Sequence, residues 1–184
     1  SLPVKSVGGL IALAKSKPGQ INYASAGVGS SIYLTMALFV HRTGVEMFHV
    51  PYKSGAPALS DLIAGQVSAQ FVTVPPVLPH IKSGRVRALG ITSAERFPLL
   101  PDLPTIAESG MPGFEDYFWQ GVVAPRGTPP EIITKLNAEI RKALDSPPVR
   151  ERLTGMGTAI VGSTPEQLTD FIKAQIDRWR EVFK

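Results

Sequence analysis

The sequence has no cysteine, no long apolar run and no dense cluster of charge of one sign, and each absence removes a class of function. Without cysteine there is no disulfide, no thiol nucleophile and no cysteine-ligated zinc or iron–sulfur cluster. The apolar runs, such as residues 8–14, fall far short of the ~20 residues that a membrane-spanning helix needs. Charged residues make up 18% of the chain, and acids interrupt the basic residues, so we expect no nucleic-acid partner.

What the sequence does contain is typical of an α/β protein. It has 184 residues, 43% of them hydrophobic, which is enough for one domain or two small ones with a sizeable core. Its 17 glycines and 17 prolines are scattered between short apolar segments, which indicates short elements joined by tight turns. The first half follows a strand–loop–helix pattern about four times, which predicts a mostly parallel sheet with helices on its faces. We expect strands at residues 21–24, 46–50, 67–73 and 86–92, and helices at 10–17, 33–40 with Gly44 as C-cap, 56–63 and 75–82.

The pattern changes after residue 92. Four prolines and two glycines between residues 93 and 118 forbid long regular elements, so we expect a wrapping connection there. An apolar strand is predicted at 118–124, and a further one could form at 159–162. Thr128 and Thr164 each begin a capping-box pattern, and each is followed by an apolar stripe that should be buried. The stripes are Ile132, Ile133, Leu136, Ile140 and Leu144, then Leu168, Phe171, Ile172, Ile176 and Trp179. These helices need a sheet to lie against, which the chain does not obviously provide.

The stretch from Ser25 to Ser31 is the most informative for function. Two glycines and three serines lie there between a predicted strand and a predicted helix. Amides of a first helical turn are unpaired, and the helix dipole favours an anion by ~0.3–1 kcal/mol at exposed sites. The serine hydroxyls add donors. A plain serine N-cap with glycines for tight packing explains this loop equally well. The stretch is neither a nucleotide phosphate loop nor a dinucleotide fingerprint, because it lacks their further residues.

A second loop strengthens the anion-site interpretation. Ser54, Gly55 and Ala56 again follow a predicted strand and open a helix, and Thr73 ends the next strand. In an open parallel sheet, ligand loops gather at this edge, so the three segments would line one crevice. Lys53 could supply charge, although a lone lysine is more often a solvated surface residue. Tyr52 is interpreted as core or hinge packing.

Catalytic patterns are weak. His41, His49 and His80 have no metal-ligand spacing and are interpreted as surface or structural histidines. The sequence identifies no base partner for Ser25, Ser30 or Ser31, and no paired carboxylates. We therefore expect neither catalysis, nor a metal, nor a cofactor.

Several stretches resemble one known family. They are Asn22–Ser30, Val50–Leu59, Leu62–Val67, Leu78–Gly84, Arg87–Thr92, Leu103–Gly110 and Ala124–Pro129. The chain is similar, nearly from end to end, to the Bug-type receptors, which are the extracytoplasmic solute-binding proteins of tripartite tricarboxylate transporters.

The resemblance implies a type II periplasmic-binding-protein fold of two α/β domains around a cleft. Residues 3–118 would be the complete ligand-binding second lobe. Residues 119–184 would be a crossing strand and the C-terminal helices of the first lobe, whose N-terminal part is absent. The implied function is capture of a small carboxylate in the periplasm, with membrane transporter subunits as partners and no enzymatic activity. The implied ligand contacts are Ser25, Ala26, Gly27, Gly29, Ser30, Ser54, Gly55, Ala56 and Thr73.

Two positions depart from the family's pattern. Tyr33 replaces the usual histidine, and Val72 stands where aspartate or a small residue is common. Without that carboxylate the pocket has less to offer an ammonium group, so we expect a ligand with carboxylates and no amine. The alternatives are a receptor that signals to a membrane sensor, an enzyme that uses the anion loop, and a fragment without function.

Overall fold

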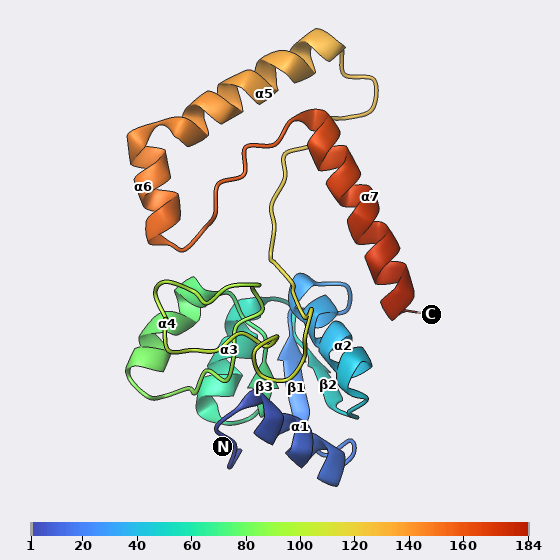
Figure 1. Cartoon of the computed structure of the whole chain (residues 1–184), viewed down its shortest axis with the longest axis vertical. Helices are drawn as coiled ribbons and strands as arrows, with labels where there is room; N and C mark the ends of the chain where they lie inside the picture. Colours follow the sequence, from blue (N-terminus) through green and yellow to red (C-terminus); the bar gives the residue numbers. More distant parts are fainter. Residues whose placement is uncertain (1, 184) are drawn as a thin grey trace. The chain divides into compact units, whose positions relative to one another are not determined.

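The computed structural model describes residues 2–183 and divides into two compact units, residues 1–118 and 119–184. The first unit contains a sheet of three parallel strands in the order β2-β1-β3 (Figure 1). These strands are β1 (Asn22–Ser25), β2 (Phe48–Pro51) and β3 (Ala69–Gln70). β1 pairs with β2 along its whole length, from Asn22 opposite Phe48 to Ser25 opposite Pro51. The parallel α/β fold class predicted from the sequence is therefore confirmed.

The strand order creates a reversal in the path of the chain. From β1 the chain moves outward to β2, then crosses back over β1 to reach β3 on its other side. Connections that leave neighbouring strands in opposite directions open a crevice at the carboxyl ends of those strands. Here that switch point lies between β1 and β3.

The helices of the first unit are α1 (Val7–Ser16), α2 (Ser31–Thr43), α3 (Gly55–Ala64) and α4 (Val74–Lys82). Alternate strand residues face opposite sides of a sheet, and this alternation places α2 and α3 on different faces. Tyr23 of β1 stacks on His49, which also contacts Tyr33 of α2. On the other face, Ala24 packs in an apolar cluster with Ala58 of α3.

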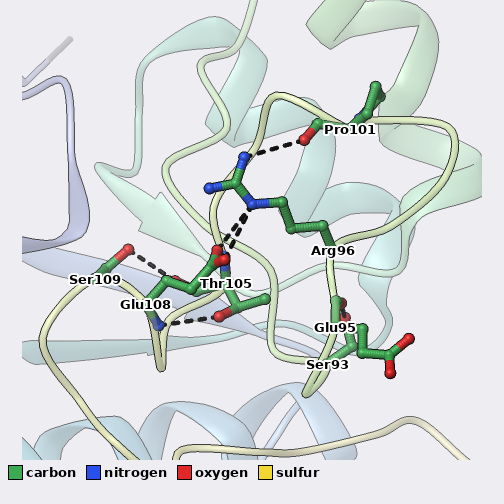
Figure 2. Close-up of polar contacts among 7 residues, drawn as sticks. All are labelled: Ser93, Glu95, Arg96, Pro101, Thr105, Glu108 and Ser109. Carbon is green, nitrogen blue, oxygen red and sulfur yellow. Dashed lines mark hydrogen bonds and ion pairs between the residues drawn. The ribbon is translucent and has the colours of Figure 1, made fainter.

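Residues 93–118, the wrapping segment, run around the first unit and form no regular helix, as the prolines of this segment predict. Its Phe114 is almost completely buried and meets Phe39 of α2 edge to face at 6.4 Å between ring centroids. Figure 2 shows a polar cluster that fixes its turns: Arg96 pairs with Glu108 at 3.0 Å and donates to the Pro101 carbonyl. Glu108 also accepts from the Thr105 amide at 2.8 Å, and these two contacts lower its carboxyl pKa, the amide more than Arg96.

The second unit contains α5 (Pro130–Asp145), α6 (Pro147–Gly155) and α7 (Pro165–Val182), and no strand among its described residues, 119–183. The predicted capping box at Thr164 is confirmed. Trp119 meets Phe171 of α7 edge to face at 5.2 Å. The Asn137 side chain of α5 donates to the Ser163 carbonyl at 2.9 Å.

Several sequence predictions for strands are wrong. Residues 86–92 form only an isolated bridge from Ile91 to Thr105, and residues 118–124 and 159–162 form no strand. β3 is also shorter than the predicted 67–73. An apolar segment becomes a strand only where a neighbouring strand completes its hydrogen bonds, and none of the three described strands does so here.

Two predictions for the second unit are also wrong. The N-cap of α5 is Pro129, and Thr128 instead donates to the Pro125 carbonyl, so the predicted capping box is absent there. The expected buried stripes are not buried: no residue of α5 or α7 is fully buried, and Leu136 is 48% exposed. No described strand of this unit exists to cover them.

Candidate functional site

The loop between β1 and α2 is built around Gly27. Its backbone has a φ of 102°, which residues with a Cβ rarely adopt. Its carbonyl accepts from the Ser30 amide at 3.2 Å and from the Ser30 hydroxyl at 2.7 Å. Its amide donates to the Ser25 hydroxyl at 3.1 Å. A Cβ at this position would also lie 3.4 Å from the Tyr52 carbonyl oxygen, so the turn requires glycine.

The same loop leaves main-chain donors open. The Ser30 hydroxyl accepts from the Tyr33 amide at 3.3 Å and so caps α2. Within the part of the chain that the structure describes, the amides of Val28, Gly29 and Ser31 donate to no protein acceptor. Val28 and Gly29 are exposed at the tip of the loop. These donors therefore remain available to an anion.

The loop between β2 and α3 lies beside the first loop. The Tyr52 amide donates to the Ser25 carbonyl at 3.0 Å, and a Cβ at Gly55 would lie 3.5 Å from Cδ1 of Ile32. Ser54 is the N-cap of α3, but its hydroxyl makes no capping hydrogen bond. The amides of Gly55 and Ala56 also have no acceptor among the described residues.

Thr73 follows β3 and is the N-cap of α4. Its side chain is exposed and makes no capping hydrogen bond. Because β3 pairs with β1 on the side opposite β2, Thr73 follows the strand across the switch point from the Gly27 loop. No described hydrogen bond joins Thr73 to the other two loops.

Together these segments put the beginnings of three helices after neighbouring parallel strands. Each helix start carries the positive end of the helix dipole, and unpaired amides there hold carboxylates and phosphates well. Chemically, such an arrangement can bind negative charge through the main chain, with hydroxyls from Ser54 and Thr73 as further donors.

The predicted ligand contacts do not all lie together in the structure. The loop of Ser25, Ala26, Gly27, Gly29 and Ser30 lies beside the loop of Ser54, Gly55 and Ala56, and the contacts between them run through Tyr52 and Ile32. Thr73 lies after the neighbouring strand. Contrary to expectation, the hydroxyls of Ser25 and Ser30 serve the loop itself. Ser25 is completely buried.

Sequence reasoning missed one contact of Ser25. Its Oγ lies 2.6 Å from Nε2 of His49, a partner that the sequence alone did not identify. The parallel register of β1 and β2, which places His49 two positions before Pro51, the residue opposite Ser25, was the signal that could have revealed it. Burial lowers the pKa of His49 below its ordinary 6.5. Because Ser25 is fully buried, the pair does not present a nucleophile to a substrate.

Tyr52 and Lys53, the two residues before Ser54, have the packing and surface roles that the sequence predicts. The Tyr52 hydroxyl donates to Oδ2 of Asp61 at 2.6 Å, which raises the tyrosine pKa, and its ring packs on the apolar cluster around Ala24. Lys53 is exposed at the surface. The Lys53 side chain therefore lies at the surface beside the loop and is not fixed within it.

Other kinds of site are not apparent among residues 2–183. No group of three or more histidine, aspartate or glutamate side chains is arranged to hold a metal ion in this part of the chain. None of its helices combines the length and apolar character needed to cross a bilayer. A surface hollow of about 550 Å³ runs along α1, lined by Val4, Ala12 and Leu13 among others, and none of the predicted ligand contacts lines it.

Comparison with known proteins places the chain in one family. The whole chain, residues 1–184, matches the model of the tripartite tricarboxylate transporter family receptor. It is 47% identical over 174 residues to a UPF0065 protein from Pseudomonas sp. (strain P51), covering 94% of this chain and 52% of the relative. It is 42% identical over 183 residues to protein BugT of Bordetella pertussis, covering 100% and 56%. The chain thus spans about half the length of these curated relatives.

Solved structures agree with this match. The chain resembles Rpa4515 of R. palustris, determined with adipate, with a TM-score of 0.89 and 41% identity over 99% of this chain and 61% of the other. It also resembles MatC of Rhodopseudomonas palustris, determined with malate, with a TM-score of 0.86 and 36% identity over 99% and 63%. The predicted periplasmic-binding-protein fold and the predicted resemblance are thereby confirmed. The chain belongs to the tripartite tricarboxylate transporter receptors, a family of periplasmic solute-binding proteins.

Proposed function

We propose that this chain carries the carboxylate-binding loops of a periplasmic receptor that captures a small carboxylate for tripartite tricarboxylate-type uptake. The observation that carries the proposal is the set of unpaired amides where α2 and α3 begin, next to the switch point. The adipate and malate in the two related structures are small dicarboxylates, which is consistent with this chemistry.

In the proposed binding mode, one carboxylate accepts from the amides of Val28, Gly29 and Ser31. The amides of Gly55 and Ala56 and the Ser54 hydroxyl are the second group of donors, and the Thr73 hydroxyl the third. Bridging waters complete the set, because such contacts are nearly as favourable as direct hydrogen bonds.

The proposed domain arrangement is the one that the resemblance to the family suggests. Residues 3–118 form the ligand-binding lobe, and residues 119–184 contribute a crossing segment and helices to the other lobe. The ligand occupies a cleft between the two lobes, and closure over it expels water. Such closure requires the ligand to bind the closed state more tightly than the open one. The closed receptor then delivers its ligand to the membrane subunits of the transporter.

The proposed ligand carries carboxylates and no amine. Val72 supplies no charge near Thr73, and the donors described above have no carboxylate among them to pair with an ammonium group. Malate and aspartate differ mainly in a hydroxyl against an ammonium group, so they form a matched pair of probes. Malate is expected to bind more tightly.

The experiment that tests the proposal is a titration followed by ¹⁵N NMR, which also detects weak binding. Malate and adipate should shift the amide resonances of Val28, Gly29, Ser31, Gly55 and Ala56 in a saturable way. Neutral adipamide should leave these resonances in place, and the amides of α1 provide an internal reference. Shifts spread evenly over the chain, or no saturation with any dicarboxylate, would contradict the proposal.

A substitution of Ser31 tests the main-chain donors directly. Proline is well tolerated at the first position of a helix, and Ser30 before it is already extended, with φ −67° and ψ 155°. Ser31→Pro therefore deletes one amide donor without breaking a helical hydrogen bond, whereas the control Ser31→Ala deletes only the hydroxyl. We expect Ser31→Pro to weaken dicarboxylate binding roughly three- to tenfold relative to Ser31→Ala. Equal affinities would exclude this amide from the site.

A further inference from the structure

The contact between Ser25 and His49 connects the loop that carries the proposed anion donors to the neighbouring strand β2. Ser25 is the last residue of β1, and His49 is the second residue of β2. The two side chains meet at 2.6 Å between Oγ and Nε2. The loop's conformation is thus connected to a residue 24 positions further along the chain.

The hydrogen-bond geometry holds Oγ of Ser25 between His49 and Gly27. A serine hydroxyl has one proton to donate, and Oγ of Ser25 already accepts from the Gly27 amide at 3.1 Å. The other two contacts of Oγ are Nε2 of His49 at 2.6 Å and the Gly27 carbonyl at 3.3 Å. In one tautomer of His49 the hydroxyl donates to Nε2, and in the other Nε2–H donates to Oγ while the hydroxyl donates to the Gly27 carbonyl. In both tautomers Oγ still accepts from the Gly27 amide.

The surroundings of His49 favour this neutral form. Its ring stacks on Tyr23 at 4.9 Å between centroids and meets Tyr33 at 5.0 Å. Burial disfavours the charged imidazolium and lowers the pKa of His49. In its neutral form the ring engages Oγ of Ser25 through Nε2 in either tautomer.

We propose that His49 is a positioning residue for the ligand loop, which it holds through Ser25 and Gly27. The contact with Nε2 fixes the side-chain rotamer of Ser25, so that an Oγ lone pair stays directed at the Gly27 amide. That bond holds Gly27 in its left-handed turn with its carbonyl turned inward to Ser30. The amides of Val28 and Gly29 then remain open at the tip of the loop. The expected effect on ligand binding rests on the proposed function, in which this loop binds the anion.

Four variants of the chain test the inference. His49→Phe keeps a ring against Tyr23 and removes the nitrogen that contacts Ser25. His49→Gln restores a hydrogen-bonding group, because its carboxamide reaches the place of Nε2 and can donate or accept. Ser25→Ala removes the other partner, and the double variant His49→Phe with Ser25→Ala closes a mutant cycle. His41→Phe, at an exposed position in the last turn of α2, is the control.

Malate affinity and hydrogen exchange of the Gly27 amide are measured for each variant at a temperature where all are folded. We expect His49→Phe and Ser25→Ala each to weaken malate binding about five- to tenfold and to speed exchange at Gly27. The double variant should lose no more malate affinity than either single variant, and His49→Gln should recover most of the affinity. His41→Phe should match the wild type.

The outcomes separate the inference from the proposed function. If the wild type binds malate and His49→Phe binds it equally well, or if the two single losses add, the positioning role of His49 is wrong. If the wild type binds no dicarboxylate, the proposed function fails instead. In that case an unchanged Gly27 exchange rate in His49→Phe would still overturn the inference.

Discussion

The hydroxyl of Thr35 in α2 donates to Oδ2 of Asp116 at 2.5 Å, across 81 positions of sequence, and both residues are buried. The amide of Asp116 also donates to the Thr92 carbonyl. Asp116 therefore links the wrapping segment to α2, the helix that begins at the proposed anion-binding loop. Because a buried carboxylate needs its donors, this link holds the segment in place.

Thr35→Val is expected to destabilise the chain because it withdraws a donor from a buried carboxylate. The expected loss is about 1–3 kcal/mol in the free energy of unfolding, measured by urea denaturation. The control is Thr43→Val in the same helix, where the hydroxyl bonds only to carbonyls of its own helix. Similar losses for the two variants would show that the Asp116 contact contributes nothing.

Gly90→Ala is expected to destabilise the chain through overpacking. A Cβ at Gly90 would lie 2.9 Å from Cγ2 of Val7 and 3.3 Å from Cγ1 of Ile106, both in buried residues. Overpacking of this kind costs about 1–3 kcal/mol. Val7→Ala removes the closest methyl, so the double variant should be more stable than the sum of the two single losses predicts.

Gly8→Ala is the control, since nothing lies within 4 Å of a Cβ at that helical position. Thermal and urea unfolding should show no loss for Gly8→Ala. A Gly90→Ala variant as stable as the wild type would refute the close approach of α1 to residue 90.

The stability of the first unit should depend on pH through His49. The imidazole is surrounded by the rings of Tyr23 and Tyr33 and the hydroxyl of Ser25, and burial lowers its pKa below 6.5. As the pH falls below about 6.5 the unfolded chain therefore binds more protons than the folded one. The contribution of His49 is fully present above that pH and is lost as the pH falls towards the lowered pKa of the folded state.

Urea unfolding between pH 7.5 and pH 5 checks this expectation. His49→Phe should flatten the decline in unfolding free energy. Parallel curves for the wild type and His49→Phe would contradict the lowered pKa.

Gln70→Met is expected to stabilise the chain. Both the nitrogen and the oxygen of the Gln70 carboxamide are buried without a hydrogen-bond partner. A buried polar group without a partner costs about 1–3 kcal/mol, and methionine has similar volume with no such demand. The control is Gln66→Met, whose side chain is exposed. Urea unfolding should place the Gln70→Met midpoint above that of the wild type, and a lower midpoint would show that the carboxamide is satisfied in solution.

Local signals in the sequence explain which parts of the fold were predictable. Glycines and prolines marked the ends of α1, α2 and α3, and Gly44 caps α2 as expected. The capping box at Thr164 was read correctly because both partners lie within four residues. The strands at 86–92 and 118–124 were not predictable in this way, since a strand depends on a distant neighbour.

In the candidate site, too, local features were predictable from the sequence and contacts between distant residues were not. Serines and glycines after strands indicated the helix starts with open amides, and those amides are unpaired. The sequence did not reveal that the hydroxyls of Ser25 and Ser30 are used within the loop, because their partners are set by the φ of Gly27. Nor did it reveal the Ser25–His49 contact, which depends on the pairing of β1 with β2.

Recognition by peptide N–H groups has a consequence for how such a receptor diversifies. Every amino acid except proline brings the same main-chain donor, so mutations can replace the side chains around the helix starts and leave the affinity for negative charge intact. Ligand length and shape are then set by variable side chains, while charge preference is inherited with the backbone. One scaffold can in this way come to bind different acids by small steps. Proline, loss of the glycine that the turn at residue 27 requires, or a change of loop length interrupts the series.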